Sequence, residues 1–170
     1  MDAIEAIMTR RSIRKFTTKE VAPETVDKLL RAAMAAPSAR NEQPWHFIVV
    51  RDKTTLAKIP QVNQHAQMAA EAPLVIVICS DNKLQKANSD YCVLDCCLAG
   101  QNILLAAHSL GLGAVWTALY PNEERVRKAR ELFQIPNDIT PLCVIPLGWP
   151  AEKKGKEDRF MPDRIHQEQW

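Results

Sequence analysis

The sequence has few glycines, few aromatic residues and almost no excess of charge of either sign. Of its 170 residues, 5 are glycine and 6% are aromatic, and 22 basic residues against 20 acidic ones leave a formal net charge of +2. A dedicated nucleic-acid binder usually carries a strongly basic face, so this balance argues against one. The sequence also shows no sustained repeat, which excludes collagen-like and coiled-coil chains.

Long apolar runs and paired cysteines are lacking as well. No apolar run reaches the ~18 residues of a membrane span, and the opening MDAIEAIMTRR lacks the apolar stretch and cleavage site of a signal peptide. The five cysteines form no Cys-x-x-Cys pair, so we expect reduced thiols and a cytoplasmic protein. Cys92 and Cys96 lie four apart on an apolar segment, which favours core residues over metal ligands, and we expect no metal.

The residues that are present fit one domain over 1–170, since 46% are hydrophobic and 25% are charged. Periodicity and end signals predict helices over 2–9, 23–36, 52–72 (in two pieces broken near Pro60), 89–110 and 122–133. Apolar runs predict strands over 45–50, 74–79, 113–118 and 141–147, followed by a polar tail over 150–170.

The segment 89–110 is apolar nearly all round, which is typical of a central helix or of one shared with a partner subunit. Ser89 or Asp90 could cap its start. Gly111 suits its end, and Gly113 would allow a close approach of the backbone to a neighbouring group.

Two polar segments could carry chemistry. Arg10-Arg11-Ser12-Ile13-Arg14 offers three guanidiniums and a hydroxyl that suit phosphate oxygens, although a solvated basic turn would look the same. The loop from Ser38 to Gln43 offers amides that match the edge of a planar heterocycle, although an ordinary connection would have this composition too. No nucleophile, zinc-protease or P-loop motif is present, so an enzyme built on this chain would leave its chemistry to a cofactor.

In their order along the chain, five segments resemble the nitroreductase family of FMN-dependent oxidoreductases. They are RRSIRKF at 10–16, APSARNEQPWHFIVV at 36–50, AEAPLVIVIC at 70–79, GLGAVW at 111–116 and IPLGWPAEKKGKEDRF at 145–160. The resemblance implies an α+β fold with a mixed central sheet flanked by helices. It also implies an intertwined homodimer with two FMN sites at the subunit interface, where the tail over 150–170 contacts the partner.

The resemblance also assigns roles to residues. Arg10, Arg11 and Ser12 would hold the FMN phosphate and ribityl chain, and Arg14 would stabilise negative charge at flavin N1 and O2. The partner chain would line the flavin with its loop, and the full set of cofactor-binding positions is Arg10, Arg11, Ser12, Arg14, Pro37, Ser38, Ala39, Asn41, Val115, Trp116, Thr117 and Arg159. Glu157 stands where many relatives have a lysine, and roles for Gln43, Gln64 and Gln67 stay open.

The function implied is hydride transfer from NADH or NADPH to FMN, and then reduction of a flat acceptor, such as a nitroaromatic, a quinone or a flavin, in a ping-pong sequence. No side chain acts as a catalytic group in this scheme, and neither nucleic acid nor membrane is a partner. The alternatives are a specialised FMN enzyme of the same fold, with dehalogenation or flavin-modifying chemistry, and a non-enzymatic anion-binding module. A dimerisation domain that has lost its flavin is the remaining alternative.

Overall fold

One sheet organises the chain, of which a computed structural model describes residues 1–84 and 89–170. Its strands lie in the order β1 (Trp45–Val50), β2 (Leu74–Asp81), β5 (Ile139–Gly148) and β3 (Gly113–Ala114), and β4 (Thr117–Ala118) also pairs with β5. These pairs are antiparallel, while Ser12 forms a parallel bridge to Ala114. The expected α+β class with a mixed sheet is therefore confirmed.

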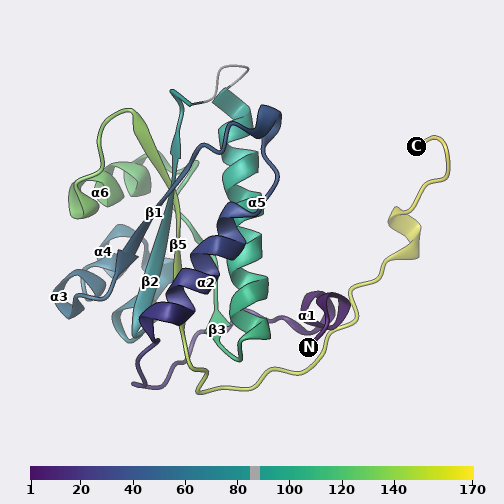
Figure 1. Cartoon of the computed structure of the whole chain (residues 1–170), viewed down its shortest axis with the longest axis horizontal. Coiled ribbons are helices and arrows are strands. Elements are labelled where there is room, and N and C mark those ends of the chain that lie inside the picture. Colours follow the sequence, from purple (N-terminus) through teal and green to yellow (C-terminus); the bar gives the residue numbers. More distant parts are fainter. Residues whose placement is uncertain (85–88) are drawn as a thin grey trace.

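Helices cover both faces of this sheet (Figure 1). The helices α2 (Pro23–Met34) and α5 (Ser89–Ser109) lie on one face, and α3 (Lys53–Leu56), α4 (Ile59–Val62) and α6 (Glu123–Phe133) lie on the other. Successive side chains of a strand point to opposite faces, so β2 places Ile76 in the first core and Val77 in the second. This explains why the whole of Leu74–Ser80 is buried and apolar apart from its last residue.

Two predicted elements are divided differently in the structure. The segment 52–72 forms α3, α4 and a 3-10 segment η2 (Gln64–Ala70), and Pro60 lies in the first turn of α4, where its missing N–H is harmless, instead of breaking a helix. The predicted strand 113–118 is split into β3 and β4, because the chain leaves the ladder at Trp116, whose indole packs against Gly100 of α5.

The helix α5 ends as predicted, at Gly111 with φ of +79°. The side chains that could cap its start lie outside the described residues. Contrary to the sequence expectation, Tyr91–Ser109 is long and apolar enough to cross a membrane by length and composition alone. Its buried side packs on the sheet and on α2, while Tyr91, Leu94 and Leu98 are 44%, 58% and 46% exposed.

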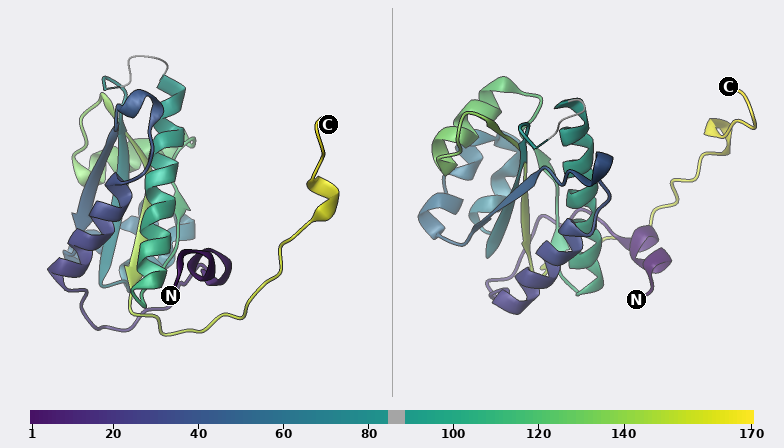
Figure 2. Two further views of the ribbon diagram at one scale, coloured as in Figure 1. Left: turned by 45° about the vertical axis from the view of Figure 1, so that its right-hand side comes forward. Right: turned by 45° about the horizontal axis from the view of Figure 1, so that its top comes forward.

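The N-terminal helix and the beginning of the tail lie near one end of α5, whereas the C-terminus lies far from it (Figure 1 and Figure 2). The short helix α1 (Ala3–Thr9) contacts α5, and the tail starts beside it and then runs away from the sheet (Figure 2). Residues 153–170 are exposed, including a 3-10 turn η3 (Pro162–Arg164). The tail carries large apolar side chains that its own chain leaves exposed, namely Phe160, Met161, Ile165 and Trp170.

Candidate functional site

The segment after α1 is fixed against the sheet by backbone contacts. The Ile13 N–H donates to the Ala114 carbonyl at 3.1 Å, and the Cβ of any residue but glycine at position 113 would come within 2.6 Å of the Ile13 side chain. Gly113 thus allows the close approach that the sequence suggested, and the segment following Arg10 joins the sheet through a single bridge at Ser12. The basic motif is therefore held beside β3.

Arg10 lies half-buried in a group of positive charges. Burial lowers the pKa of its guanidinium, and the nearby charges of Arg159 and Arg11 lower it further. Among residues 1–84 and 89–170, no acceptor or carboxylate pairs with the Arg10 side chain. The three arginines share a hollow of about 320 Å³ with Ile7, Met8, Glu157, Asp158 and Phe160. A desolvated cation among like charges is the arrangement that an anion would stabilise.

Arg11 and Arg159 are engaged in other contacts. The Arg11 Nε donates to the Gly155 carbonyl at 3.0 Å and an Nη donates to the Glu157 carbonyl at 3.3 Å, so Arg11 holds the tail. Arg159 forms an ion pair with Glu157. Glu157 therefore partly neutralises the predicted phosphate contact.

Arg14 and Ser12 are tied to the start of the tail through their backbones. The Arg14 N–H donates to Glu152 Oε1 at 2.6 Å, and Lys154 Nζ donates to the Ser12 carbonyl at 2.7 Å. The hydrogen bond from Arg14 lowers the pKa of the Glu152 carboxyl. The Arg14 side chain is exposed, and its guanidinium meets no partner within the described part of the chain.

The predicted flavin loop is ordered by its own polar groups and by α5. The Ser38 hydroxyl accepts from the Gln43 N–H at 3.0 Å, and the Gln43 side chain donates to Asn41 Oδ1 at 2.9 Å. Asp95, a buried residue of α5, accepts from the Ala39 N–H at 3.1 and 3.2 Å. The loop also holds three residues in the left-handed region, Arg40, Asn41 and Gln43. Pro37 precedes this loop and is exposed.

In the third predicted segment, over 115–117, the side chains make contacts within their own chain, so only the backbone remains for a ligand. Val115 is buried, the Trp116 indole lies against Gly100, and the Thr117 hydroxyl donates to the Val144 carbonyl at 2.8 Å. The buried Asn63 donates to the Ala118 carbonyl at 3.0 Å and supports this segment from the opposite face of the sheet.

One chain does not bring the basic motif and the polar loop together. The loop is fixed to α5 at Asp95, and the basic motif is fixed near the other end of α5, where Thr9 and His108 are hydrogen-bonded at 2.8 Å. Thirteen residues separate these two anchors, and at 1.5 Å per residue the helix holds them about 20 Å apart. Sequence reasoning missed Asp95 and His108 as anchors, because their partners lie 56 and 99 residues away.

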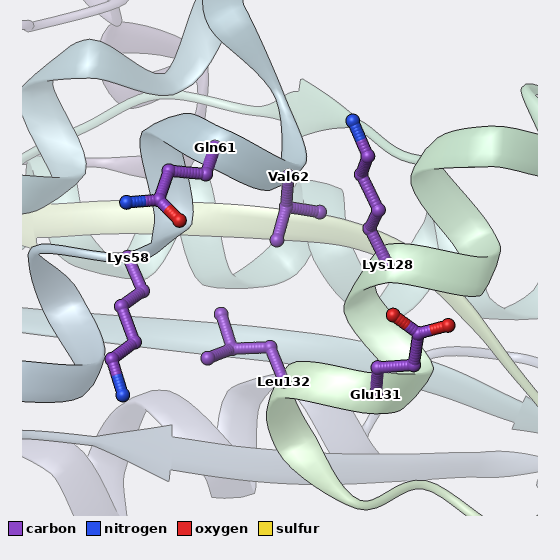
Figure 3. Close-up of a pocket in the computed structure, with 6 residues that line it drawn as sticks. All are labelled: Lys58, Gln61, Val62, Lys128, Glu131 and Leu132. Carbon is purple, nitrogen blue, oxygen red and sulfur yellow. The ribbon is translucent and has the colours of Figure 1, made fainter.

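A larger hollow lies elsewhere, between α4 and α6 (Figure 3). It measures about 560 Å³ and is lined by Lys58, Gln61, Val62, Lys128, Glu131 and Leu132. None of these is a predicted site residue. Within residues 1–84 and 89–170, no group of three or more potential ligands could hold a metal ion. All five cysteines are free, and four of them are buried while Cys97 is exposed.

Comparison with known proteins identifies the family. Residues 7–149 match the model of the nitroreductase family. A protein of Methanothermobacter thermautotrophicus, provisionally named NADH dehydrogenase/NAD(P)H nitroreductase, is 56% identical over the whole chain and 88% of its own length. A crystal structure from Parabacteroides distasonis with the same provisional name superposes with a TM-score of 0.95 at 42% identity, over 99% of this chain and 98% of that one.

A solved FMN-dependent nitroreductase from Clostridium difficile has a TM-score of 0.91 at 31% identity, over 98% of this chain and 99% of the other. The family match covers most of the chain, and the structures agree over nearly all of it. The chain therefore belongs to the nitroreductase family.

Proposed function

We propose that the chain binds FMN in two interfacial sites of a homodimer and passes electrons from NADH or NADPH to a flat acceptor in ping-pong order. As a member of its family, the chain is an FMN-dependent NAD(P)H oxidoreductase. The acceptor class is a nitroaromatic, a quinone or a flavin. The observation that carries the proposal is the half-buried Arg10, which meets other arginines in a hollow and lacks an anionic partner among the described residues.

The basic motif fits the phosphate of FMN. Arg10, with Arg11 and Arg159 beside it, supplies the positive charge that a phosphate would neutralise, and Ser12 follows directly with a hydroxyl donor. Because Arg11 and Arg159 already have partners, we assign the largest share of phosphate binding to Arg10.

The remaining residues of the site come from a second copy of the chain. The loop over 37–43 lies about 20 Å from the basic motif along α5, which is too far for both to hold one small site. If two chains pair through the exposed sides of their α5 helices in antiparallel fashion, the loop of one chain meets the basic motif of the other. Exposed Leu94 and Leu98 on α5, and Ile4 and Ile7 on α1, give this interface its apolar area. We expect the tail over 150–170 to extend over the partner.

FMN, when bound, supplies the hydride chemistry of both half-reactions. The protein binds and orients it, and stacking on its ring gives the acceptor its geometry. The exposed Arg14 guanidinium would hold positive charge where the reduced cofactor gains negative charge. No side chain is assigned as an acid or a base. The free thiols fit a reducing compartment, and we propose the cytoplasm.

An absorption spectrum of the purified protein, before and after anaerobic NADH or NADPH, tests this function. We expect a flavin spectrum that bleaches with at least one donor. A flavin that resists both donors would favour a specialised enzyme of the same fold. A colourless chain that takes up no added FMN would contradict the proposal and favour the anion-binding module.

Replacing Arg14 with alanine should lower the flavin reduction potential, because the reduced form loses a stabilising cation. A shift of about −30 mV corresponds to a tenfold change for a two-electron couple. Reduction by NAD(P)H should slow in parallel, and Arg14→Lys should recover part of both. Spectroelectrochemistry measures the potential, and an unchanged potential and rate in Arg14→Ala would remove this role from Arg14.

A further inference from the structure

We propose that His108 is a positioning residue for the phosphate-binding arginine and that its charge couples FMN binding to pH. This inference rests on the proposed function, since it adds a residue to the phosphate site. His108 lies in the last turn of α5 and contacts Thr9, the residue directly before Arg10.

The hydrogen bonds of Thr9 define how His108 acts. The Thr9 hydroxyl donates its single proton to the Glu5 carbonyl at 2.6 Å. Its oxygen must therefore accept from His108, whose Nε2 lies 2.8 Å away. His108 thus carries its proton on Nε2, and further protonation would occur at Nδ1 without breaking this bond.

This bond is important because α1 is held by little else within its own chain. Ala6 is the buried residue of α1, while Ile4, Ile7 and Met8 are 70%, 52% and 62% exposed in the chain. A short helix with so little buried surface depends on specific contacts for its position. The bond from His108 attaches the last residue of α1 to the core helix and so fixes the position of the Arg10 backbone.

The charges around His108 determine its response to pH. Burial lowers the pKa of His108, Arg10 and Arg11 lower it further, and Glu5 raises it. The hollow that His108 lines also contains charged groups of the tail, Glu152, Lys153 and Lys154. A bound phosphate would offset the repulsion from the arginines and raise the pKa of His108. By linkage, FMN binding would then strengthen as the pH falls and His108 takes up a proton.

The test compares FMN with riboflavin, which lacks the phosphate, by fluorescence titration of the flavin-free full chain between pH 5.5 and 8. His108→Ala removes the hydrogen bond and the charge. Thr9→Val removes the bond to His108, together with the Thr9–Glu5 hydrogen bond, and leaves the imidazole in place. His108→Gln keeps an amide donor but cannot be protonated. His46→Gln is the matched control, because His46 lies on β1 and faces Asp81 across 3.6 Å.

At pH 8, we expect His108→Ala and Thr9→Val to weaken FMN binding about three- to tenfold, with riboflavin binding unchanged. His108→Gln should bind FMN as the wild type does at pH 8. The Kd of His108→Gln for FMN, divided by the Kd of the wild type, should be about threefold larger at pH 5.5 than at pH 8. Because both proteins bind the same ligand, the ionisation of the phosphate itself cancels in this ratio.

An FMN affinity of His108→Ala equal to that of the wild type would overturn the proposal. So would an equal loss of FMN and riboflavin binding, or a wild-type pH dependence in His108→Gln. Arg10→Ala separates these results from failure of the site itself. If Arg10→Ala loses the preference for FMN over riboflavin while His108→Ala keeps it, only the role of His108 is wrong. A wild-type chain that prefers neither ligand would overturn the phosphate site and this role together.

Discussion

Burial and the positive charges around Arg10 disfavour the charged form of its side chain in the ligand-free protein. Arg10 is partly desolvated, and Arg11 and Arg159 face it with charges of the same sign. Elsewhere on the surface, arginines pair with carboxylates, as Arg31 does with Asp27 and Arg127 with Glu131. An unpaired, half-buried arginine among like charges is difficult to explain by stability, whereas an anionic ligand explains it.

Replacing Arg10 with alanine should therefore separate binding from stability. We expect the Kd for FMN to rise about 10- to 100-fold, since a charge-assisted hydrogen bond to phosphate contributes about 1.5–3 kcal/mol. The melting temperature of the flavin-free protein should stay the same or rise, because a repulsive charge is removed. Fluorescence titration and thermal unfolding measure the two effects, and the surface variant Arg31→Ala is the control. Unaltered FMN affinity in Arg10→Ala would refute its role.

The loop over 37–43 and the helix α5 are joined by hydrogen bonds. Arg40 and Gln43 adopt left-handed backbone conformations with φ of 54° and 50°, each of which costs about 1 kcal/mol for a residue other than glycine. The contacts of Ser38 and Asp95 hold the loop in this shape. Backbone strain that the surroundings maintain is common in ligand sites, where it preorganises the groups that bind.

Replacing Asp95 with alanine should release the loop from α5. The Ala39 N–H would lose its acceptor, and we expect the Kd for FMN to rise about tenfold, together with a fall of about 2–4 °C in melting temperature per 1 kcal/mol lost. Asp95→Asn retains one acceptor oxygen, so its Kd and melting temperature should lie between those of the wild type and Asp95→Ala. If Asp95→Ala binds FMN with the wild-type Kd but has a lower melting temperature, Asp95 stabilises the fold and does not influence the site.

At the scale of the whole molecule, the two halves of the proposed site lie at opposite ends of one helix. Large apolar side chains are exposed on α5, α1 and the tail, and Trp170 is fully exposed. A second copy would cover these faces and complete both sites at once. FMN binding and dimerisation should therefore be linked.

Replacing Leu98 with glutamate places a charge in the exposed apolar face of α5. We expect a monomer by analytical ultracentrifugation and loss of FMN from the purified protein, because each site would lose the loop of its partner. Lys53→Gln on α3, on the other face of the sheet, lowers the net charge by the same single unit and should leave both properties intact. A Leu98→Glu monomer that retains FMN would show that one chain alone can bind FMN and would contradict the shared site.

Much of the fold follows from local sequence. Asn122 caps α6 through the Arg125 N–H at 3.0 Å, as its position before a charged helix predicted. The apolar run at 74–79 became the strand β2, which is buried on both faces. The motif order along the chain indicated the family, which the comparison with known proteins confirmed. These properties depend on residues near one another in sequence, so pattern and capping suffice.

Other properties depended on the tertiary structure. The sequence showed arginines at 10 and 11 but could not show that Arg11 binds the tail at Gly155 while Arg10 is left without a partner in the described structure. It showed His108 on a helix but not its bond to Thr9, because only the packing of α1 on α5 brings these residues together. Local sequence determines elements and their ends, whereas partners 50 or more residues apart are decided by how the elements pack.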